Sequence, residues 1–334
     1  MKTAVLALTK GGRQLAETIA AELEGCRNEP SGESVASALK KIWPSYDGLI
    51  FIMATGIVVR SIAPLCRDKK TDPCVIVLDE KGEFVISLLS GHLGGGNDLA
   101  RRIALITGGQ PVITTASDVT GHTAIDVWAK ENELSVDDPR KVTAVSAKLV
   151  NQGFVTIYSD VLVNSFPADF NEVSKVRGSD IILSHKRYPG NPALRLCPKN
   201  LVVGLGCNRD TGCNAFDGAV VELFEKENLD RDAIGAYASI DIKNDEEGLI
   251  NFARETRCPI LFFSKDELNG VSGVSTSLAA LSATGAKGVA EPSAILGATT
   301  ESGPGKLIVR KHKWKDVTAA IAQKSIRLKD SFQS

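Results

Sequence analysis

Short apolar runs alternate with amphipathic segments along nearly the whole chain of 334 residues. The runs TAVLAL (3–8) and GLIFIMA (48–54) predict strands, because unbroken apolar runs bounded by turn signals are typical of buried strands. Leu99, Ile103 and Ile106 recur at helical spacing and predict the apolar face of a helix. This alternation of strands and helices predicts layered α/β domains, with ligands outside the carboxyl ends of the strands.

One segment departs from simple strand–helix alternation. PCVIVLDEKGEFVISLL (73–89) reads as two strands joined by a tight turn at Lys81 and Gly82. A hairpin places two neighbouring strands antiparallel, so we expect this sheet to be mixed. The run QPVITT (110–115) predicts a further strand after the helix.

The pattern changes twice along the chain. Residues 134–199 are polar at first and then rich in proline and glycine, with one predicted helix and one predicted strand, FVTIY (154–158). A new α/β pattern begins at NLVVGLGCNRDTG (200–212) and ends with two strand candidates, KLIVRK and VTAAIA. The fold class we predict is α/β: two three-layer α/β/α domains with mainly parallel or mixed sheets, joined by a small middle region. The predicted boundaries are 1–133 for an N-terminal domain with a glycine-rich loop, 134–199 for a variable middle region and linker, and 200–334 for a C-terminal domain.

Composition excludes several classes of function. The chain has 39 Lys and Arg against 40 Asp and Glu, and only 5% aromatic residues, which argues against a nucleic-acid-binding surface. No apolar run approaches the ~20 residues that span a bilayer, and the N-terminal run is too short for a signal peptide. The seven cysteines are scattered without a CxxC pair, so we expect free thiols in the cytoplasm and no protein-bound metal.

A glycine-rich loop carries the strongest candidate chemistry. LLSGHLGGGNDLARRIA (88–104) places a histidine beside three glycines just before a helix, where backbone N–H groups and the helix dipole suit carboxylates or phosphates. Histidine is the side chain best suited to general acid or base catalysis near neutral pH, which makes His92 a candidate for that role. The alternatives are that His92 is structural, that Asn97 is only a helix N-cap, and that the glycines form only a turn. The candidate binding residues here are Ser90, Gly91, Gly94, Gly95, Gly96 and Asn97.

Two further strand-to-helix corners carry polar residues. MATGIVVR (53–60) contains Thr55, Gly56 and Arg60, whose guanidinium suits a carboxylate, although Arg60 pairing with a surface acid is an equal alternative. TTASDVTGH (114–122) contains Thr114, Thr115 and Asp118, which serve either a turn or a pocket. We expect the three corners to converge on one side of one sheet, because all of them leave strands that could share it.

The C-terminal candidates are weaker. GLGCNRDTG has only part of a dinucleotide-binding fingerprint, because Arg209 stands where the third glycine is required. Cys207 lacks a neighbouring histidine and is interpreted as a buried or lining thiol. Lys243 belongs to a charged segment that reads more simply as surface, and Glu291 stands at a helix start as ordinary capping would place it. The candidate binding residues of this domain are Gly204, Gly206, Cys207, Asn208, Ser239, Lys243 and Glu291.

Taken together, these motifs resemble a known family. FIMATGIVVRSIAPL, DKKTDPCVIVLDEKGEFVISLLSGHLGGGNDLARRIA and QPVITTASDVTG resemble the N-terminal domain of the CbiG-type cobalt-precorrin-5A hydrolases of anaerobic cobalamin biosynthesis. VGLGCNRDTG, ASIDIKNDEEGL and GVAEPSAIL look like the C-terminal domain of that family. The resemblance covers nearly the whole chain. Gly96, Asn97 and Asp98 stand where the family usually has Ala and Asn-Glu, which shortens the reach of the carboxylate.

The resemblance implies a reaction and its requirements. The substrate would be a cobalt-containing tetrapyrrole whose ring A acetate is closed as a δ-lactone; its opening and the loss of acetaldehyde would give cobalt-precorrin-5B. Cobalt would arrive inside the substrate, so no cofactor is expected, and transient contact with neighbouring methyltransferases of that pathway is expected. Lactone hydrolysis needs a base and oxyanion donors. We hypothesise that His92 is the base, oriented by Asp98 or Asp118, with the N–H groups of Gly94 to Asn97 as donors.

Two alternatives of other classes stay open. A non-catalytic tetrapyrrole carrier would bind the same macrocycle without turning it over. A nucleotide-dependent enzyme would use the glycine loops for phosphates, and binding of a nucleotide would then raise its melting temperature. The missing third glycine and the lack of a Walker lysine argue against that second alternative.

Overall fold

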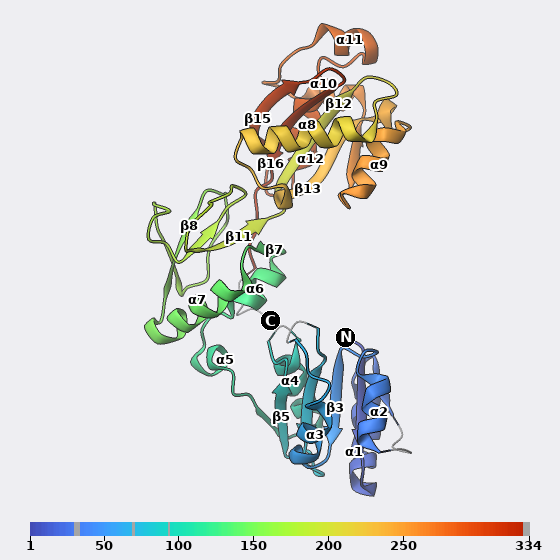
Figure 1. Ribbon diagram of the computed structural model, residues 1–334, viewed down its shortest axis with the longest axis vertical. Helices are drawn as coiled ribbons and strands as arrows, with labels where there is room; N and C mark the ends of the chain where they lie inside the picture. The colour runs from blue at the N-terminus through green and yellow to red at the C-terminus, as the bar shows by residue number, and fades with distance from the viewer. Residues whose placement is uncertain (30–33, 69–70, 93, 330–334) are drawn as a thin grey trace. The chain divides into compact units, whose positions relative to one another are not determined.

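A computed structural model describes residues 1–29, 34–68, 71–92 and 94–329 of the chain (Figure 1). It contains three β-sheets, one of six strands and two of five. The chain divides into two compact units, residues 1–127 and 128–334. The first sheet belongs to the first unit, and the other two belong to the second. Within the described residues no helix is long and apolar enough to cross a membrane.

The first sheet is mixed, as the hairpin predicts. Its strand order is β2-β1-β3-β4-β5-β6. The first four strands in this order are parallel, β5 is antiparallel to β4, and β6 is parallel to β5. The last two strands therefore run against the other four. The bounds are β1 (Thr3–Ala7), β2 (Cys26–Asn28), β3 (Gly48–Ile52), β4 (Cys74–Leu78), β5 (Phe84–Leu89) and β6 (Gln110–Val112).

Helices cover both faces of this sheet, which confirms a three-layer domain. Alternate residues of the buried strands point to opposite faces, so Ile50 and Ile76 pack with α1 and α4 while Leu49 and Phe51 pack with α2 and α3. Each face buries an apolar cluster of its own. The bounds of these four helices are α1 (Lys10–Glu22), α2 (Val35–Ile42), α3 (Thr55–Ile62) and α4 (Gly96–Thr107). Two short helices, α5 (Ala116–Thr120) and α6 (Ile125–Glu131), follow β6 in the chain.

The middle region is a complete small sheet, richer in structure than the sequence indicates. The order is β7-β11-β10-β8-β9, with α7 (Pro139–Gln152) packed against it. The bounds are β7 (Leu134–Val136), β8 (Val155–Ser159), β9 (Phe170–Glu172), β10 (Ile181–Leu183) and β11 (Leu194–Pro198). The expectation of a single strand is therefore wrong here. Three of the strands that the sequence did not predict, β7, β9 and β10, have only three residues each. Such strands are too short to show the alternation of apolar and polar residues that marks a strand.

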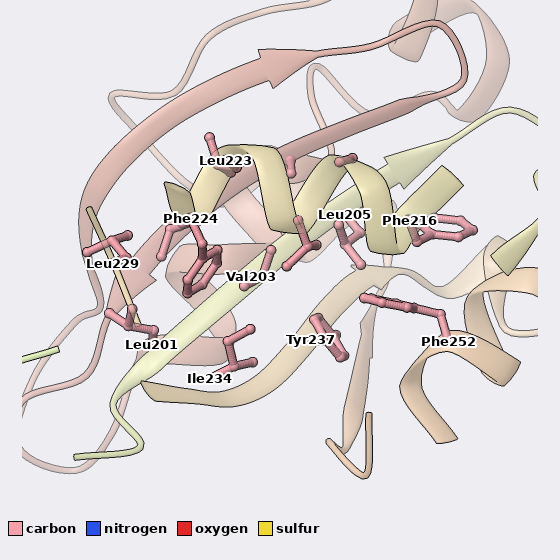
Figure 2. Packing of buried hydrophobic residues seen from close by; sticks show 14 of the residues in the cluster. Leu201, Val203, Leu205, Phe216, Leu223, Phe224, Leu229, Ile234, Tyr237 and Phe252 are labelled. Carbon is pink, nitrogen blue, oxygen red and sulfur yellow. The ribbon is translucent and has the colours of Figure 1, made fainter. Parts of the chain in front are cut away.

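The C-terminal sheet has the order β14-β13-β12-β16-β15. In Figure 2, Val203 and Leu205 of β12 lie on the side of the strand that α8 covers, and Leu201 lies beside Leu229. All three belong to one apolar cluster with Phe216, Leu223 and Phe224 of α8. The alternate residue Val202 packs on the opposite face with alanines of α12. The bounds are β12 (Leu201–Cys207), α8 (Cys213–Lys226), β13 (Ile234–Ile240), α9 (Glu247–Glu255), β14 (Ile260–Phe263), α10 (Lys265–Gly270), α11 (Leu278–Thr284), α12 (Ala290–Ala298), β15 (Lys306–Lys313) and β16 (Val317–Gln323), with 3₁₀ turns η1 (Arg231–Ala233) and η2 (Asp241–Lys243). This domain is also three-layered.

The N-terminal sheet and the C-terminal sheet each contain one strand from which the chain adds later strands first on one side and then on the other. In the N-terminal sheet the chain leaves β1 toward β2 and then returns to β3 on the other side. In the C-terminal sheet it leaves β12 toward β13 and β14, and returns through α12 to β15 and β16 on the other side. Such switch points open a crevice outside the carboxyl end of the first strand, where open α/β sheets bind ligands.

Candidate functional site

The glycine-rich loop lies at an unexpected edge of the N-terminal sheet. Because β5 is antiparallel, its last residue Leu89 pairs with Val75 near the start of β4. Ser90 Oγ accordingly donates to the carbonyl of Asp72, just before β4. Thr55, by contrast, follows the carboxyl end of β3. The expectation that all three corners converge is therefore wrong: the loop and the corner after β6 share one edge, and the Thr55 corner lies at the opposite edge.

His92 is held in a network of carboxylates. Its Nε2 lies 2.9 Å from Asp118 Oδ2, and its Nδ1 lies 3.9 Å from Asp126 Oδ1. The side chains of His92 and Asp118 are each 16% exposed and that of Asp126 is 24% exposed, so the group is sheltered but open to solvent. A carboxylate at hydrogen-bond distance from one ring nitrogen fixes the tautomer and orientation of a histidine, as in hydrolytic triads.

Two donors hold Asp118 in turn. Asn97 Nδ2 donates to Asp118 Oδ2 at 2.9 Å and to Thr115 Oγ1 at 3.1 Å. The guanidinium of Arg101 donates from NH2 to Asp118 Oδ1 at 2.6 Å. Its NH1 donates to Asp98, whose side chain is 81% exposed. Of the two acids proposed to orient His92, the structure therefore places Asp118 against the ring and Asp98 on the far side of Arg101.

The glycines of the loop have conformational reasons of their own. Gly95 is the N-cap of α4 with φ of 76°, in the left-handed region that favours glycine. A Cβ at Gly91 would lie 2.5 Å from Asn97 Oδ1, so glycine lets the loop pass close to that side chain. Asn97 is itself almost fully buried, and its Oδ1 has no hydrogen-bond partner among the described residues.

The proposed oxyanion donors are occupied within the loop. The N–H groups of Gly95, Gly96 and Asn97 donate to the carbonyls of His92, Ser90 and Gly91, at 2.9, 3.3 and 2.8 Å. A donor bonded inside its own turn is not aimed at a ligand. The hypothesis that these three groups stabilise an oxyanion is therefore wrong for this conformation. Arg101, which the sequence reading missed, is the positive charge that the structure places beside the His92 network.

The Thr55 corner borders a separate cavity of about 680 Å³ at the β1–β3 switch point. Its walls are mostly apolar, with Met53 and Ile57 beside Thr55. A Cβ at Gly56 would lie 3.5 Å from the guanidinium nitrogens of Arg60, so that side chain folds back over its own helix. Thr114 is exposed in the segment after β6, at the His92 edge.

Three of the C-terminal candidates are internal. A Cβ at Gly204 would lie 1.9 Å from the carbonyl oxygen of Ala290, so this glycine permits α12 to pack on β12. Ser239 is fully buried and donates to the carbonyl of Leu205. Lys243 is buried and pairs with Glu246 at 3.1 Å. These residues support the fold, and the reading of Lys243 as surface charge is wrong.

The remaining C-terminal candidates line a cavity of about 240 Å³ at the carboxyl end of β12. They are Gly206, Cys207, Asn208 and Glu291. Burial raises the pKa of the Cys207 thiol to about 11, which makes it a lining group and not a nucleophile at neutral pH. Among the described residues no group of three His, Cys, Asp or Glu side chains is arranged to hold a metal ion.

Comparison with known proteins agrees with this architecture. Models described as cobalamin synthesis G N-terminal, cobalamin biosynthesis central region and cobalamin synthesis G C-terminus match residues 37–118, 123–198 and 201–322. A cobalt-precorrin-5A hydrolase from Priestia megaterium is 34% identical over 86% of this chain and 82% of its own length. The chain belongs to the CbiG family.

Further CbiG relatives cover the chain in the same way. A cobalt-precorrin-5A hydrolase from Salmonella typhimurium is 35% identical over 79% of this chain and 82% of its own. The crystal structure of a cobalamin biosynthesis protein G homologue from Sulfolobus solfataricus covers 97% of both chains at 24% identity, with a TM-score of 0.41. Arg101 of this CbiG chain lies within the glycine-loop motif, one helical turn after Asn97 in α4, and that spacing is the sequence signal that could have found it. Asp126 lies outside the motifs singled out from the sequence, in a different helix from Asp118, and no sequence signal marks it.

Proposed function

We propose that this chain is a cobalt-precorrin-5A hydrolase that opens the ring A δ-lactone of its substrate and releases acetaldehyde, giving cobalt-precorrin-5B. Two relatives of that name, each about a third identical over most of the chain, support the proposal. The single structural observation that carries it is the contact of 2.9 Å between His92 Nε2 and Asp118 Oδ2 in a partly exposed site. A histidine oriented by a carboxylate is suited to activate water for lactone hydrolysis.

In the first step His92 acts as general base. When Nε2 donates to Asp118, the neutral ring carries its lone pair on Nδ1, the nitrogen that faces Asp126. Nδ1 takes a proton from water as the water oxygen attacks the lactone carbonyl. The acyl C–O bond of the lactone then breaks, and the imidazolium of His92 returns its proton to the departing oxygen, giving the free acetate and an alcohol on the extruded carbon. Asp118 stabilises the imidazolium that forms, as the acid of a hydrolytic triad does.

The second step breaks a carbon–carbon bond. Loss of the alcohol proton forms the C=O of acetaldehyde, and the electron pair of the breaking C–C bond passes into the macrocycle, which is then protonated. The sum is one water added and one acetaldehyde released. His92, alternating between its two protonation states, is placed to exchange these protons. Arg101 NH2 lies 2.6 Å from Asp118 Oδ1 and holds that carboxylate in position during both transfers.

The setting of the reaction belongs to the same proposal. Cobalt enters as part of the substrate, and no resident cofactor is needed because the macrocycle itself accepts the electron pair. The seven free thiols fit a reducing cytoplasm. Transient transfer of intermediates to and from the neighbouring methyltransferases of the pathway is proposed as well, and co-purification with them would test it.

Acetaldehyde release from cobalt-precorrin-5A tests the proposal directly. We expect the native chain to release it, and we expect His92→Ala to bind the substrate with native affinity while release falls at least a hundredfold, the usual worth of a general base. His312→Ala, at a histidine of β15 that contacts Lys226 of α8, is the matched control. Binding without release by the native chain would replace the hydrolase with the carrier alternative. Equal release by the native chain and by His92→Ala would assign the base elsewhere.

A further inference from the structure

The cavity of about 240 Å³ in the C-terminal domain occupies the position where this fold binds ligands. It lies at the carboxyl end of β12, the strand from which the chain leaves to both sides of the sheet. The start of α12 forms one wall, through Gly288 to Pro292. That nine-residue helix has no side-chain cap at Val289, and Ala290 and Glu291, the residues that carry its first N–H groups, are among the lining residues.

Lysines from the β15–β16 hairpin also line the cavity. Lys311, Lys313 and Lys315 all line the cavity. The residues between them face the other side of the sheet: His312 contacts Lys226 of α8 at 3.3 Å, and the indole of Trp314 donates to Glu222 of α8 at 2.9 Å. Strand alternation therefore directs Lys311 and Lys313 to the α12 side together, and Lys315 lines the cavity from the turn after β15.

The one buried acid of the cavity is already satisfied. Glu291 is 1% exposed, and its carboxylate accepts from the N–H and hydroxyl of Ser275 at 2.6 and 3.0 Å and from the N–H of Lys311 at 2.9 Å. These bonds tie the loop before α11 and the lysine strand to the start of α12. Asp316, the other acid of the wall, accepts from Asn208 Nδ2 at 3.0 Å. Both carboxylates thus brace the cavity walls, and the lysines supply charge toward a ligand.

We propose that this cavity binds a peripheral carboxylate arm of the tetrapyrrole substrate, with Lys311 and Lys313 as the specificity-determining residues. This rests on the proposed function for the identity of the substrate. The volume is below the ~300–1,000 Å³ of pockets that enclose whole ligands, so it suits an acetate or propionate side chain and excludes the macrocycle. Lysine ammonium groups and an uncapped helix N-terminus are both matched to a carboxylate.

Equilibrium binding by the full chain tests this proposal without turnover. The probe is uroporphyrin III, a tetrapyrrole with acetate and propionate on every ring, titrated while protein fluorescence is followed. We expect Lys311→Gln and Lys313→Gln each to weaken binding roughly tenfold, the value of one charge-assisted hydrogen bond, and to reduce its dependence on salt. Lys306→Gln, on the same strand but outside the cavity, is the matched control and should bind as the native chain does.

Kinetics on cobalt-precorrin-5A separate this proposal from the hydrolase proposal. We expect the two lysine variants to raise KM about tenfold with kcat within twofold of native, whereas His92→Ala keeps binding and loses kcat. Native affinity in both lysine variants, or equal weakening in Lys306→Gln, would overturn the cavity proposal. If free acetate displaced bound uroporphyrin III at concentrations as low as those at which uroporphyrin III itself binds, the cavity would be a site for a free small anion. That result would also overturn the cavity proposal. Lysine-dependent binding without any acetaldehyde release would uphold the cavity and overturn only the hydrolase.

Discussion

The N-terminal and C-terminal domains share one architecture and use it differently. Both are three-layer α/β/α domains with a mixed sheet and a glycine-containing loop at a sheet edge. In the N-terminal domain the titratable side chains meet each other: His92, Asp118 and Arg101 form a partly exposed network. At the cavity of the C-terminal domain the two acids, Glu291 and Asp316, accept hydrogen bonds from neutral groups, and three lysines line the cavity. Titratable groups in contact with one another are suited to acid–base catalysis. Lysines that line a cavity are suited to binding an anionic ligand.

The largest expected effect falls on the N-terminal network. Asp118→Asn removes the carboxylate that orients His92 and presents an amide to Arg101 and Asn97, so we expect kcat for acetaldehyde release to fall about 100- to 1,000-fold. Affinity for uroporphyrin III should stay within twofold. Glu83→Gln, an exposed carboxylate at the opposite edge of the same sheet, controls for charge and should keep native kcat. If Asp118→Asn instead weakened uroporphyrin III binding and kept native kcat, the N-terminal network would serve binding, and the assignment of chemistry to one domain and binding to the other would be wrong.

Local strand signals explain how much of this fold the sequence predicts. Runs such as TAVLA and GLIFI are buried at every position, so they read as strands without reference to the rest of the chain. The hairpin at Lys81 and Gly82 was equally readable, and β4 and β5 confirm it. Its consequence was harder to draw: reversing β5 moves the His92 loop to the edge opposite Thr55. Which edge a loop occupies depends on the direction of pairing between strands, a non-local property.

The site was predictable only in part. His92 and Asp118 stand in two motifs whose composition marks them, His92 in the glycine-rich loop and Asp118 in the short helix α5. Asp126 and Arg101 lie within helices, and only the tertiary structure brings them to the network. The amides of Gly95 and Gly96 show the reverse case, because a glycine run suggests open N–H groups and the folded loop bonds them internally. Hydrogen bonding inside a turn is invisible to composition.

The second largest effect should be on stability, and it should differ between a glycine of the C-terminal domain and a glycine of the N-terminal domain. Gly204→Ala places a Cβ 1.9 Å from the backbone oxygen of Ala290, so α12 must shift, and we expect a loss of about 3 kcal/mol in the free energy of unfolding. Gly95→Ala meets only the flexible end of Met1 at 2.7 Å and a positive φ, which costs about 1 kcal/mol. Urea denaturation followed by circular dichroism compares them. If Gly95→Ala unfolds at the lower urea concentration, the packing argument for Gly204 fails.

A smaller effect should depend on pH. Burial alone would raise the pKa of Glu291, but hydrogen bonds from the N–H groups of Lys311 and Ser275 outweigh it and hold that pKa below the ordinary value. Its contribution to stability is therefore fully present above the unfolded pKa of ~4.3 and is lost as pH falls through the lower folded pKa. We expect Glu291→Gln to cost about 1–2 kcal/mol at pH 7 and progressively less below about pH 4. Urea midpoints at both pH values measure this, and a cost independent of pH would show that the charge of Glu291 does not brace the cavity.

The smallest effect on kcat should come from substitution of Asp98. It tests whether Asp118 alone, or Asp98 as well, orients His92. Asp98→Asn breaks an exposed ion pair with Arg101 NH1 but leaves the contact of Arg101 NH2 with Asp118 in place. Because exposed ion pairs contribute little, we expect kcat to fall less than about threefold and KM to stay native. Asp118→Asn is compared in the same acetaldehyde assay, and both variants replace a carboxylate with an amide. If the two variants lose kcat equally, Arg101 needs both acids to hold its position, and the orientation of His92 depends on the whole chain of contacts from Asp98 to Asp118.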